Sequence, residues 1–257
     1  MIDYGLTDKV AIVTGGSDGL GRATAKLLAA EGAKVVICGR REDYLKNAAQ
    51  TLSQESGGTV VAVRADVSDG ADCENLINAT IEQFGRLDIL INNAGTSAAA
   101  SLEAVSDESW QADFDLKVMA AVRLCRMALP HFRAVGGGSI INAAIGGGKA
   151  PGPNQLPTSL TRAAGLNLTK SLANAYAAEN VRVNAICIGR IKSAQLEARA
   201  GNKPLDEFYA DMGKIVPMGR VGEADDYAHL AAFLCSKVGS YITGTAVNLD
   251  GGMCATL

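Results

Sequence analysis

Two patterns of apolar and polar positions alternate along the chain. Short, mostly apolar runs that end in glycine, such as KVAIVTGG at 9–16, are typical of strands buried inside a parallel sheet. The segments between them, such as GRATAKLLAAEGA at 21–33, have helical spacing and end near a glycine, which predicts amphipathic helices. Strands are expected at 9–16, 34–39, 59–67, 87–95, 139–145, 181–189 and 243–252, and helices at 21–33, 41–58, 70–85, 107–138, 158–180 and 223–237.

This alternation indicates the fold class. Parallel strands must be joined by crossover connections, and helices usually make them. The pattern therefore predicts an α/β protein with a doubly wound parallel sheet, the Rossmann fold. Since no linker or internal repeat divides residues 1–257, we interpret them as a single domain, with an excursion of short helices at about 190–220.

Composition excludes several classes of function. The net charge of -3 provides no basic footprint for nucleic acid, and no apolar run is long enough to cross a membrane. The first residues do not have the pattern of a secretory signal, so we expect a cytoplasmic protein with reduced thiols. His131 and His229 are far apart and the cysteines form no CxxC pair, so no metal site is expected. The cysteines are Cys38, Cys73, Cys125, Cys187, Cys235 and Cys254.

The segment TGGSDGLG at 14–21 lies between the first strand and the first helix, and it is a candidate phosphate site. Glycines allow backbone N–H groups to approach a pyrophosphate, and the helix N-terminus adds unpaired N–H groups and a positive dipole end. A simple tight turn is the alternative, but the strand–turn–helix context favours dinucleotide binding.

The end of the second strand bears on the choice between NADP and NAD. An acid there would accept a hydrogen bond from the ribose of NAD, but Gly39 takes its place and is followed by Arg40 and Arg41. A guanidinium suits a 2′-phosphate, so the sequence predicts NADP, with NAD as the alternative. Two points oppose this prediction. The arginines also fit the solvated start of a helix, and Asp18 would repel a phosphate unless it caps the first helix.

Several motifs in this order resemble the classical short-chain dehydrogenase/reductase family over nearly the whole chain. TGGSDGLG matches the family's TGxxxGxG, and ADV at 65–67 matches its adenine-binding segment. NNAG at 92–95, RVNAICIG at 182–189 and ITGTAVNLDGG at 242–252 match its fourth, sixth and last strands. The resemblance implies a three-layer α/β/α sandwich that forms a homo-oligomer, a tetramer or a dimer. It also implies hydride transfer between a nicotinamide and a small-molecule carbonyl or alcohol.

The resemblance also assigns residues to the cofactor and to the substrate. In this family the excursion at about 190–220 covers the substrate pocket. The cofactor residues it implies are Gly15, Ser17, Asp18, Gly19, Leu20, Gly21, Arg40, Arg41, Asp66, Val67, Asn93, Ala94, Gly95, Arg162 and Ser193.

The family catalyses its reaction with an Asn, a Ser, a Tyr and a Lys, and the register of this chain replaces all four. The Asn position falls on Lys117, the Ser position on Ile145, the Tyr position on Thr158 and the Lys position on Arg162. A threonine hydroxyl does not titrate near neutral pH, and a guanidinium is a poor proton donor. Lys117 is the new titratable group and becomes the candidate acid or base.

The candidate catalytic residues are therefore Lys117, Thr158 and Arg162, and each of them also has a structural interpretation. Lys117 follows Asp113 by four residues, which suits an ion pair on one helical face. Thr158 follows Pro157 and is a candidate N-cap of its helix. Arg162 is a candidate for the cofactor contact alone.

Three functions remain open at this point. The first is an NAD(P)-dependent oxidoreductase that reduces a carbonyl, imine or enone with a non-standard proton source. The second is a catalytically inactive dinucleotide-binding regulatory or partner subunit. The third is a non-redox enzyme that reuses the pocket. The cofactor half is intact while the acid–base half is replaced, which favours the first function.

Overall fold

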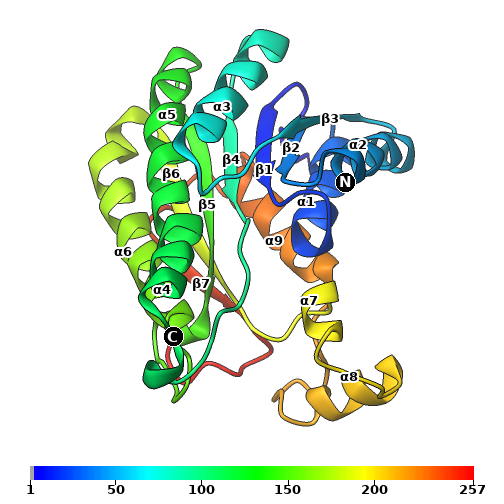
Figure 1. The fold of residues 1–257 in the computed structure, drawn as a ribbon. Helices are drawn as coiled ribbons and strands as arrows, with labels where there is room; N and C mark the ends of the chain where they lie inside the picture. The colour runs from blue at the N-terminus through cyan, green and yellow to red at the C-terminus, as the bar shows by residue number, and fades with distance from the viewer. Residues whose placement is uncertain (1–2) are drawn as a thin grey trace.

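The computed structural model describes residues 3–257, which form one parallel sheet flanked by helices (Figure 1). Within these residues the sheet has seven strands in the order β3-β2-β1-β4-β5-β6-β7. The strands are β1 (Val10–Thr14), β2 (Lys34–Gly39), β3 (Thr59–Arg64), β4 (Ile89–Asn92), β5 (Gly138–Ile145), β6 (Val181–Ile188) and β7 (Ala246–Leu249). The predicted α/β fold class is confirmed, and each strand lies within or one residue from its predicted segment.

The helices follow the strands as crossover connections. They are α1 (Gly19–Ala30), α2 (Glu42–Ser56), α3 (Gly70–Phe84), α4 (Asp107–Phe114), α5 (Ala120–Ala134), α6 (Thr158–Tyr176), α7 (Ala194–Glu197), α8 (Leu205–Gly213) and α9 (Ala224–Cys235). Shorter helical turns are η1 (Leu102–Ala104), η2 (Asp115–Met119), η3 (Gly146–Gly148) and η4 (Ala177–Glu179).

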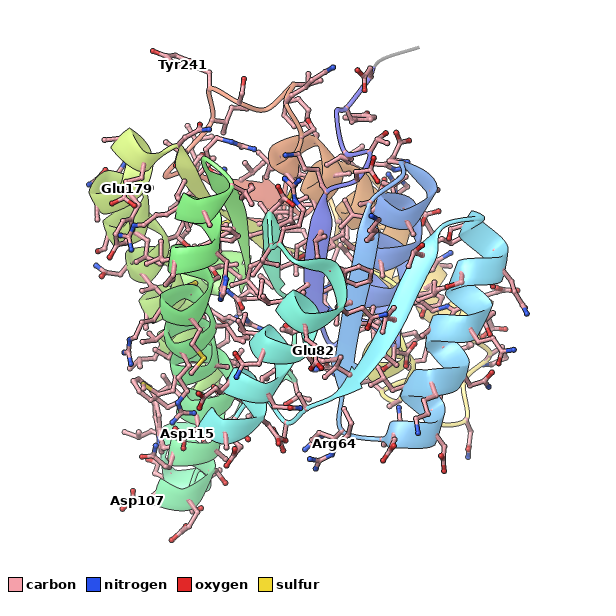
Figure 2. All side chains as sticks on the ribbon, turned by 90° about the horizontal axis from the view of Figure 1, so that it is seen from above. Arg64, Glu82, Asp107, Asp115, Glu179 and Tyr241 are labelled. Carbon is pink, nitrogen blue, oxygen red and sulfur yellow. The ribbon has the colours of Figure 1, made fainter. Side chains whose placement is uncertain are left out.

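Two apolar layers bury the two faces of the sheet. Helices α1, α2 and α9 pack on one face and α3, α5 and α6 on the other, which makes a three-layer sandwich (Figure 1). Tyr227 of α9 and Phe132 of α5 are fully buried side chains of these two layers. Burial from both sides explains why the strands of the sequence are almost wholly apolar. Charged side chains such as Arg64, Asp107 and Glu179 lie at the periphery (Figure 2).

The strand order reverses between β1 and β4, which are neighbours in the sheet. β1 pairs with β2 on one side and with β4 on the other, so the chain connections leave β1 and β4 in opposite directions. Such a switch point opens a crevice at the carboxyl ends of the strands, where ligands bind in doubly wound sheets. The glycine-rich loop follows β1 directly and therefore lies at this crevice.

The helix predicted as continuous over 107–138 is divided in the structure. A π-helical turn, η2, separates α4 from α5. A π-turn adds a residue to one helical turn and is common at functional sites, but a spacing rule with one fixed period does not reveal it. Helix α5 ends at Ala134 rather than at 138, before Gly136 and Gly137 in positive φ.

No helix within residues 3–257 has both the length and the apolar character that a membrane span requires. The same residues contain no cluster of three or more His, Cys, Asp or Glu side chains arranged to bind a metal ion. All six cysteines are free, and five of them are buried.

Candidate active site and cofactor site

The loop between β1 and α1 is shaped by its glycines. Gly15 and Gly19 have positive φ angles of 65° and 51°, which disfavour other residues. A Cβ on Gly21 would lie 2.3 Å from the carbonyl oxygen of Gly15, so only glycine fits this close contact. Asp18 is the N-cap of α1, because its carboxylate accepts a hydrogen bond of 2.7 Å from the N–H of Gly19. This is the capping alternative considered from the sequence.

The first turn of α1 has the properties of a phosphate site. Its first intrahelical hydrogen bond is donated by the N–H of Arg22 to the Asp18 carbonyl, so the N–H groups of Leu20 and Gly21 precede the helical ladder. These groups, together with the positive end of the helix dipole, suit a pyrophosphate. The predicted loop residues are therefore brought together in a cradle that fits a dinucleotide.

Asn93 braces this loop from the end of β4. Its side-chain amide donates 2.9 Å to the carbonyl of Thr14, while the N–H groups of Asn93 and Ala94 each donate 2.9 Å to the Thr14 hydroxyl. Asn93 thus acts on the glycine-rich loop through the backbone of β1. Ala94 and Gly95 continue along the same edge, where a Cβ on Gly95 would collide with the guanidinium of Arg162.

The residues predicted to select NADP lie after β2, and those of the predicted adenine-binding segment lie after β3. Arg40 is exposed and forms no salt bridge with another residue of 3–257, whereas Arg41 stacks on the ring of Tyr44 at 4.2 Å. Asp66 accepts hydrogen bonds from the N–H and hydroxyl of Ser68. Partial burial opposes its ionisation, but these two bonds and the charge of Arg40 lower the pKa of Asp66. Val67, next to it, is buried.

Lys117 is enclosed in a buried ion pair. Its Nζ contacts the carboxylate of Asp113 one helical turn earlier, and the side chain of Lys117 is 0% exposed. The same Nζ donates a hydrogen bond of 3.0 Å to the hydroxyl of Thr158. Burial lowers the pKa of Lys117, the nearby charge of Arg162 lowers it further, and Asp113 opposes both effects.

Thr158 opens α6 but does not cap it, so the sequence-based N-cap alternative is wrong. The N-cap position is Pro157, which has no side-chain donor or acceptor. The Thr158 hydroxyl instead accepts two hydrogen bonds of 3.0 Å, one from Lys117 and one from the N–H of Ala98. An oxygen that already accepts two bonds keeps its own proton for a third partner. No hydrogen bond within residues 3–257 uses that proton.

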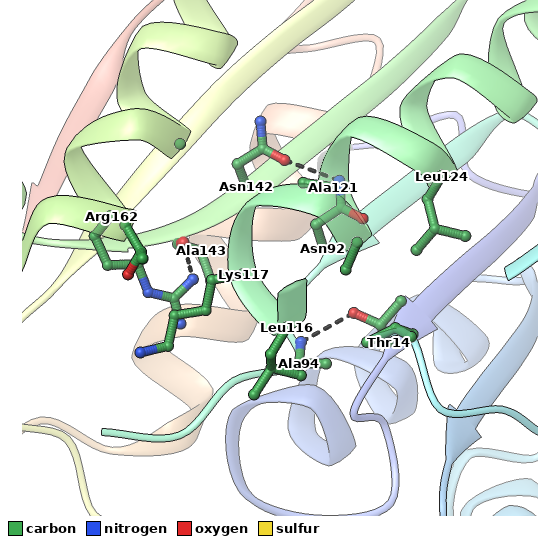
Figure 3. Close-up of a pocket in the computed structure, with 14 residues that line it drawn as sticks. Thr14, Asn92, Ala94, Leu116, Lys117, Ala121, Leu124, Asn142, Ala143 and Arg162 are labelled. Atoms are coloured by element: carbon green, nitrogen blue, oxygen red, sulfur yellow. Dashed lines mark hydrogen bonds between the residues drawn. The ribbon is translucent and has the colours of Figure 1, made fainter. Parts of the chain in front are cut away.

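Arg162 lies one helical turn beyond Thr158 and faces the same edge of the sheet. Its guanidinium donates 2.6 Å to the carbonyl of Ala143 on β5, and its Nε is buried without a partner in the described chain. Burial lowers the pKa of Arg162, opposed by the charge of Asp113. Figure 3 shows Lys117 and Arg162 side by side.

Asp113 and Thr161 complete this cluster and were not predicted as functional residues. The Thr161 hydroxyl donates 2.7 Å to Asp113, so one carboxylate joins α6 to the helix that carries Lys117. The spacing of Asp113 and Lys117 was a signal for the ion pair alone. The cluster holds two cations, Lys117 and Arg162, against one carboxylate, and is therefore net positive.

A small cavity of about 20 Å³ lies beside the cluster (Figure 3). Its lining includes Lys117, Arg162, Asn142 and Asn92. The Oδ1 of Asn92 is buried without a partner in the described chain. This volume holds about one water molecule. A substrate must therefore approach from the open edge of the sheet rather than occupy this cavity.

Ser193 and Ile145 occupy the rim of the site. Ser193 is the N-cap of α7 and accepts a hydrogen bond of 3.3 Å from Leu196, and a Cβ on Gly19 would lie 3.9 Å from the Ser193 Cβ. The excursion thus returns to the glycine-rich loop. Ile145 ends β5 and offers no hydrogen bond.

Comparisons with known proteins agree with this geometry. The family model described as Enoyl-(Acyl carrier protein) reductase matches residues 15–254. A short-chain type dehydrogenase/reductase of Sinorhizobium fredii is 34% identical over 96% of this chain and 98% of its own. A 3beta-hydroxysteroid dehydrogenase of Eggerthella lenta is 37% identical over 96% of this chain and 94% of its own.

Among solved structures, L-sorbose reductase from Gluconobacter frateurii, complexed with NADPH and L-sorbose, superimposes with a TM-score of 0.95. It is 34% identical, and the match covers 100% of both chains. The sequence motifs, the sheet order and these relatives lead to one conclusion. The chain belongs to the short-chain dehydrogenase/reductase family, whose members are NAD(P)-dependent oxidoreductases.

Proposed function

We propose that this protein is an NADP-dependent reductase of a small-molecule carbonyl, imine or enone, with Lys117 and Thr158 as its proton source. One observation carries the proposal: the Thr158 hydroxyl accepts from Lys117 and Ala98 and retains an unused proton. In the family register, the positions of the usual Asn, Ser, Tyr and Lys are occupied by Lys117, Ile145, Thr158 and Arg162, respectively. Bound NADPH would supply the hydride.

The chain's own residues would then supply the proton and stabilise charge. The Lys117 ammonium is enclosed between Asp113 and Thr158, and the Thr158 hydroxyl alone of the two has an unused proton, so we assign Thr158 as the group that meets the substrate. As the substrate oxygen or nitrogen gains negative charge, it takes the proton of the Thr158 hydroxyl. A proton of the Lys117 ammonium replaces it on Thr158. Lys117 becomes a neutral amine and regains a proton from solvent after product release.

Arg162 would contribute electrostatically. Its half-buried guanidinium next to Gly95 and Ala143 would stabilise negative charge that develops at this edge, without giving up a proton. The same guanidinium is placed to bond the hydroxyls of a ribose.

The glycine-rich loop and Arg40 would hold the phosphates of the cofactor. The pyrophosphate would lie against Gly15, Gly19 and Gly21 and the N–H groups of the first α1 turn. The free guanidinium of Arg40 would hold the 2′-phosphate.

One observation favours a second function, a dinucleotide-binding regulatory or partner subunit without turnover. The ammonium of Lys117 is enclosed and paired with Asp113, as in a purely structural ion pair. The excess positive charge and the unpartnered Nε of Arg162 favour catalysis instead, because a purely structural cluster leaves few buried donors unused.

We also propose that residues 1–257 form one domain, that the protein is cytoplasmic, and that it is a homo-oligomer, either a tetramer or a dimer. Phe114 of α4 and Leu160 of α6 are exposed apolar residues on helices that contact each other, which supports self-association. Light scattering during size-exclusion chromatography measures the mass directly, and a monomer at micromolar concentration would contradict the oligomer.

The function is tested by titrating the purified protein with NADPH and with NADH, followed by nicotinamide fluorescence. A panel of carbonyl, imine and enone compounds is then added. We expect tighter binding of NADPH and oxidation of the bound cofactor by at least one compound. Binding without oxidation by the whole panel would favour the inactive subunit or a non-redox enzyme. No binding of either cofactor would refute both main proposals.

A further inference from the structure

Arg190 lies at the carboxyl edge of the sheet, on which the proposed substrate site is also built. It follows β6 by two residues, at the same carboxyl edge of the sheet as the Lys117–Thr158 cluster. Its carbonyl accepts from the N–H of Gly222, and the next residue, Ile191, pairs with Gly222 as an isolated bridge. Three residues after Arg190, Ser193 reaches the glycine-rich loop at Gly19. Arg190 therefore belongs to a fixed segment that runs between the sheet edge and the cofactor loop.

The guanidinium of Arg190 is poorly satisfied. It is half-buried, its Nε is buried without a partner in the described chain, and its NH1 lies 3.5 Å from the sulfur of Met212 on α8. A thioether is a weak acceptor, so this contact does not compensate a desolvated cation. No salt bridge within residues 3–257 includes Arg190.

Four neighbouring cations of the excursion differ from Arg190, because each of them has a carboxylate partner. These ion pairs are Lys192–Glu223, Lys203–Asp211, Lys214–Asp211 and Arg220–Asp226. Arg199 also has no salt bridge within residues 3–257, but it is exposed and water can solvate it, whereas Arg190 is half-buried and has no counter-ion.

We infer that Arg190 binds a carboxylate of the substrate, so that the proposed reductase acts on an oxo acid. The inference rests on the proposed function. A guanidinium presents a planar fork of donors that matches the two oxygens of a carboxylate, and a charge-assisted pair would satisfy the donors that the protein leaves free. Met212 would then pack against the aliphatic part of Arg190 and keep the fork aimed at the rim.

The test uses matched pairs of carbonyl compounds that differ in the carboxylate alone: pyruvate, acetoacetate and levulinate, each with its methyl ester. The readouts are kcat/KM with NADPH and, separately, calorimetric binding of each compound to the protein saturated with NADP. In the wild type we expect at least one acid to exceed its ester by about tenfold or more in both readouts. Arg190→Met should remove this preference and Arg190→Lys should restore part of it.

Arg199→Met is the matched control, since Arg199 is an exposed arginine of the same excursion and should keep the preference. The inference is overturned if acids and esters are equivalent in the wild type, or if Arg190→Met keeps the preference. A variant that weakens NADPH itself, with an unchanged acid-to-ester ratio, would also overturn it and assign Arg190 to the cofactor. If no compound oxidises NADPH, the proposed function fails, while Arg190-dependent binding of an acid would still support the inference.

Discussion

The Nζ of Lys117 lies 3.0 Å from the Oγ1 of Thr158, although 41 positions separate the two residues in the chain. This contact joins the π-turn after α4 to the first turn of α6. It couples the buried titratable cation of the site to a hydroxyl that has an unused proton. The proposed proton route consists of these two groups.

Thr158→Val should reduce NADPH-dependent turnover by about 100-fold, because valine keeps the shape but has no proton to donate. Thr158→Ser should stay within about tenfold of the wild type, since it keeps the hydroxyl. NADPH affinity, measured by fluorescence titration, should not change in either variant. Thr80→Val provides the control, because Thr80 is a buried threonine of α3 that bonds only its own helix. Equal turnover in Thr158→Val and the wild type would remove Thr158 from the mechanism.

Breaking the Asp113–Lys117 pair should destabilise the fold. Asp113→Leu or Lys117→Met alone leaves one charge buried without its partner, which costs about 3–5 kcal/mol of unfolding free energy. The double variant Asp113→Leu/Lys117→Met should recover most of that loss and still keep only residual turnover. Urea unfolding measures the first quantity and NADPH oxidation the second. If the double variant lost the sum of both single costs, the pair would not be the source of the effect.

Turnover should depend on the protonation of Lys117. The proposed route requires the ammonium, and burial lowers the pKa of Lys117 below its ordinary value of 10.5. Reduction should therefore lose rate as the pH rises through this lowered pKa. The loss should begin below 10.5 and be absent from the residual activity of Lys117→Met. A wild-type profile that stays flat up to 10.5 would contradict the assignment.

Arg40→Ala should weaken NADPH by about 10- to 100-fold and NADH by far less, because only NADPH carries the 2′-phosphate. Titration calorimetry measures both affinities. Lys46→Ala is a suitable control, since Lys46 is an exposed cation of α2 paired with Glu42. Equal losses for both cofactors, or no loss for either, would refute the 2′-phosphate contact.

The geometry of the glycine-rich loop was predictable from the sequence because its determinants are local. Gly15, Gly19 and Gly21 lie within one turn between a strand and a helix, and their spacing alone predicts the cradle that the structure contains. The capping role of Asp18 follows from its place before the helix in the same way.

The acid–base half was less predictable because its contacts are long-range. Helical spacing suggested the Asp113–Lys117 pair, but nothing local indicated that Thr158 or Thr161 would meet it. The π-turn η2, which carries Lys117, breaks the regular spacing on which the prediction of a continuous helix depended. No sequence motif pointed to Arg190, and its role is indicated only by its missing counter-ion in the folded chain.

The most direct test of hydride transfer uses NADPH deuterated at its transferable position. The labelled cofactor is mixed with the protein and with the best compound of the panel, and the product is analysed by mass spectrometry. We predict one deuterium in the product of the wild type and almost none in the same time with Thr158→Val. An unlabelled product, or bound NADPH that stays reduced with every compound, would contradict the account and leave a protein that binds the cofactor without transferring its hydride.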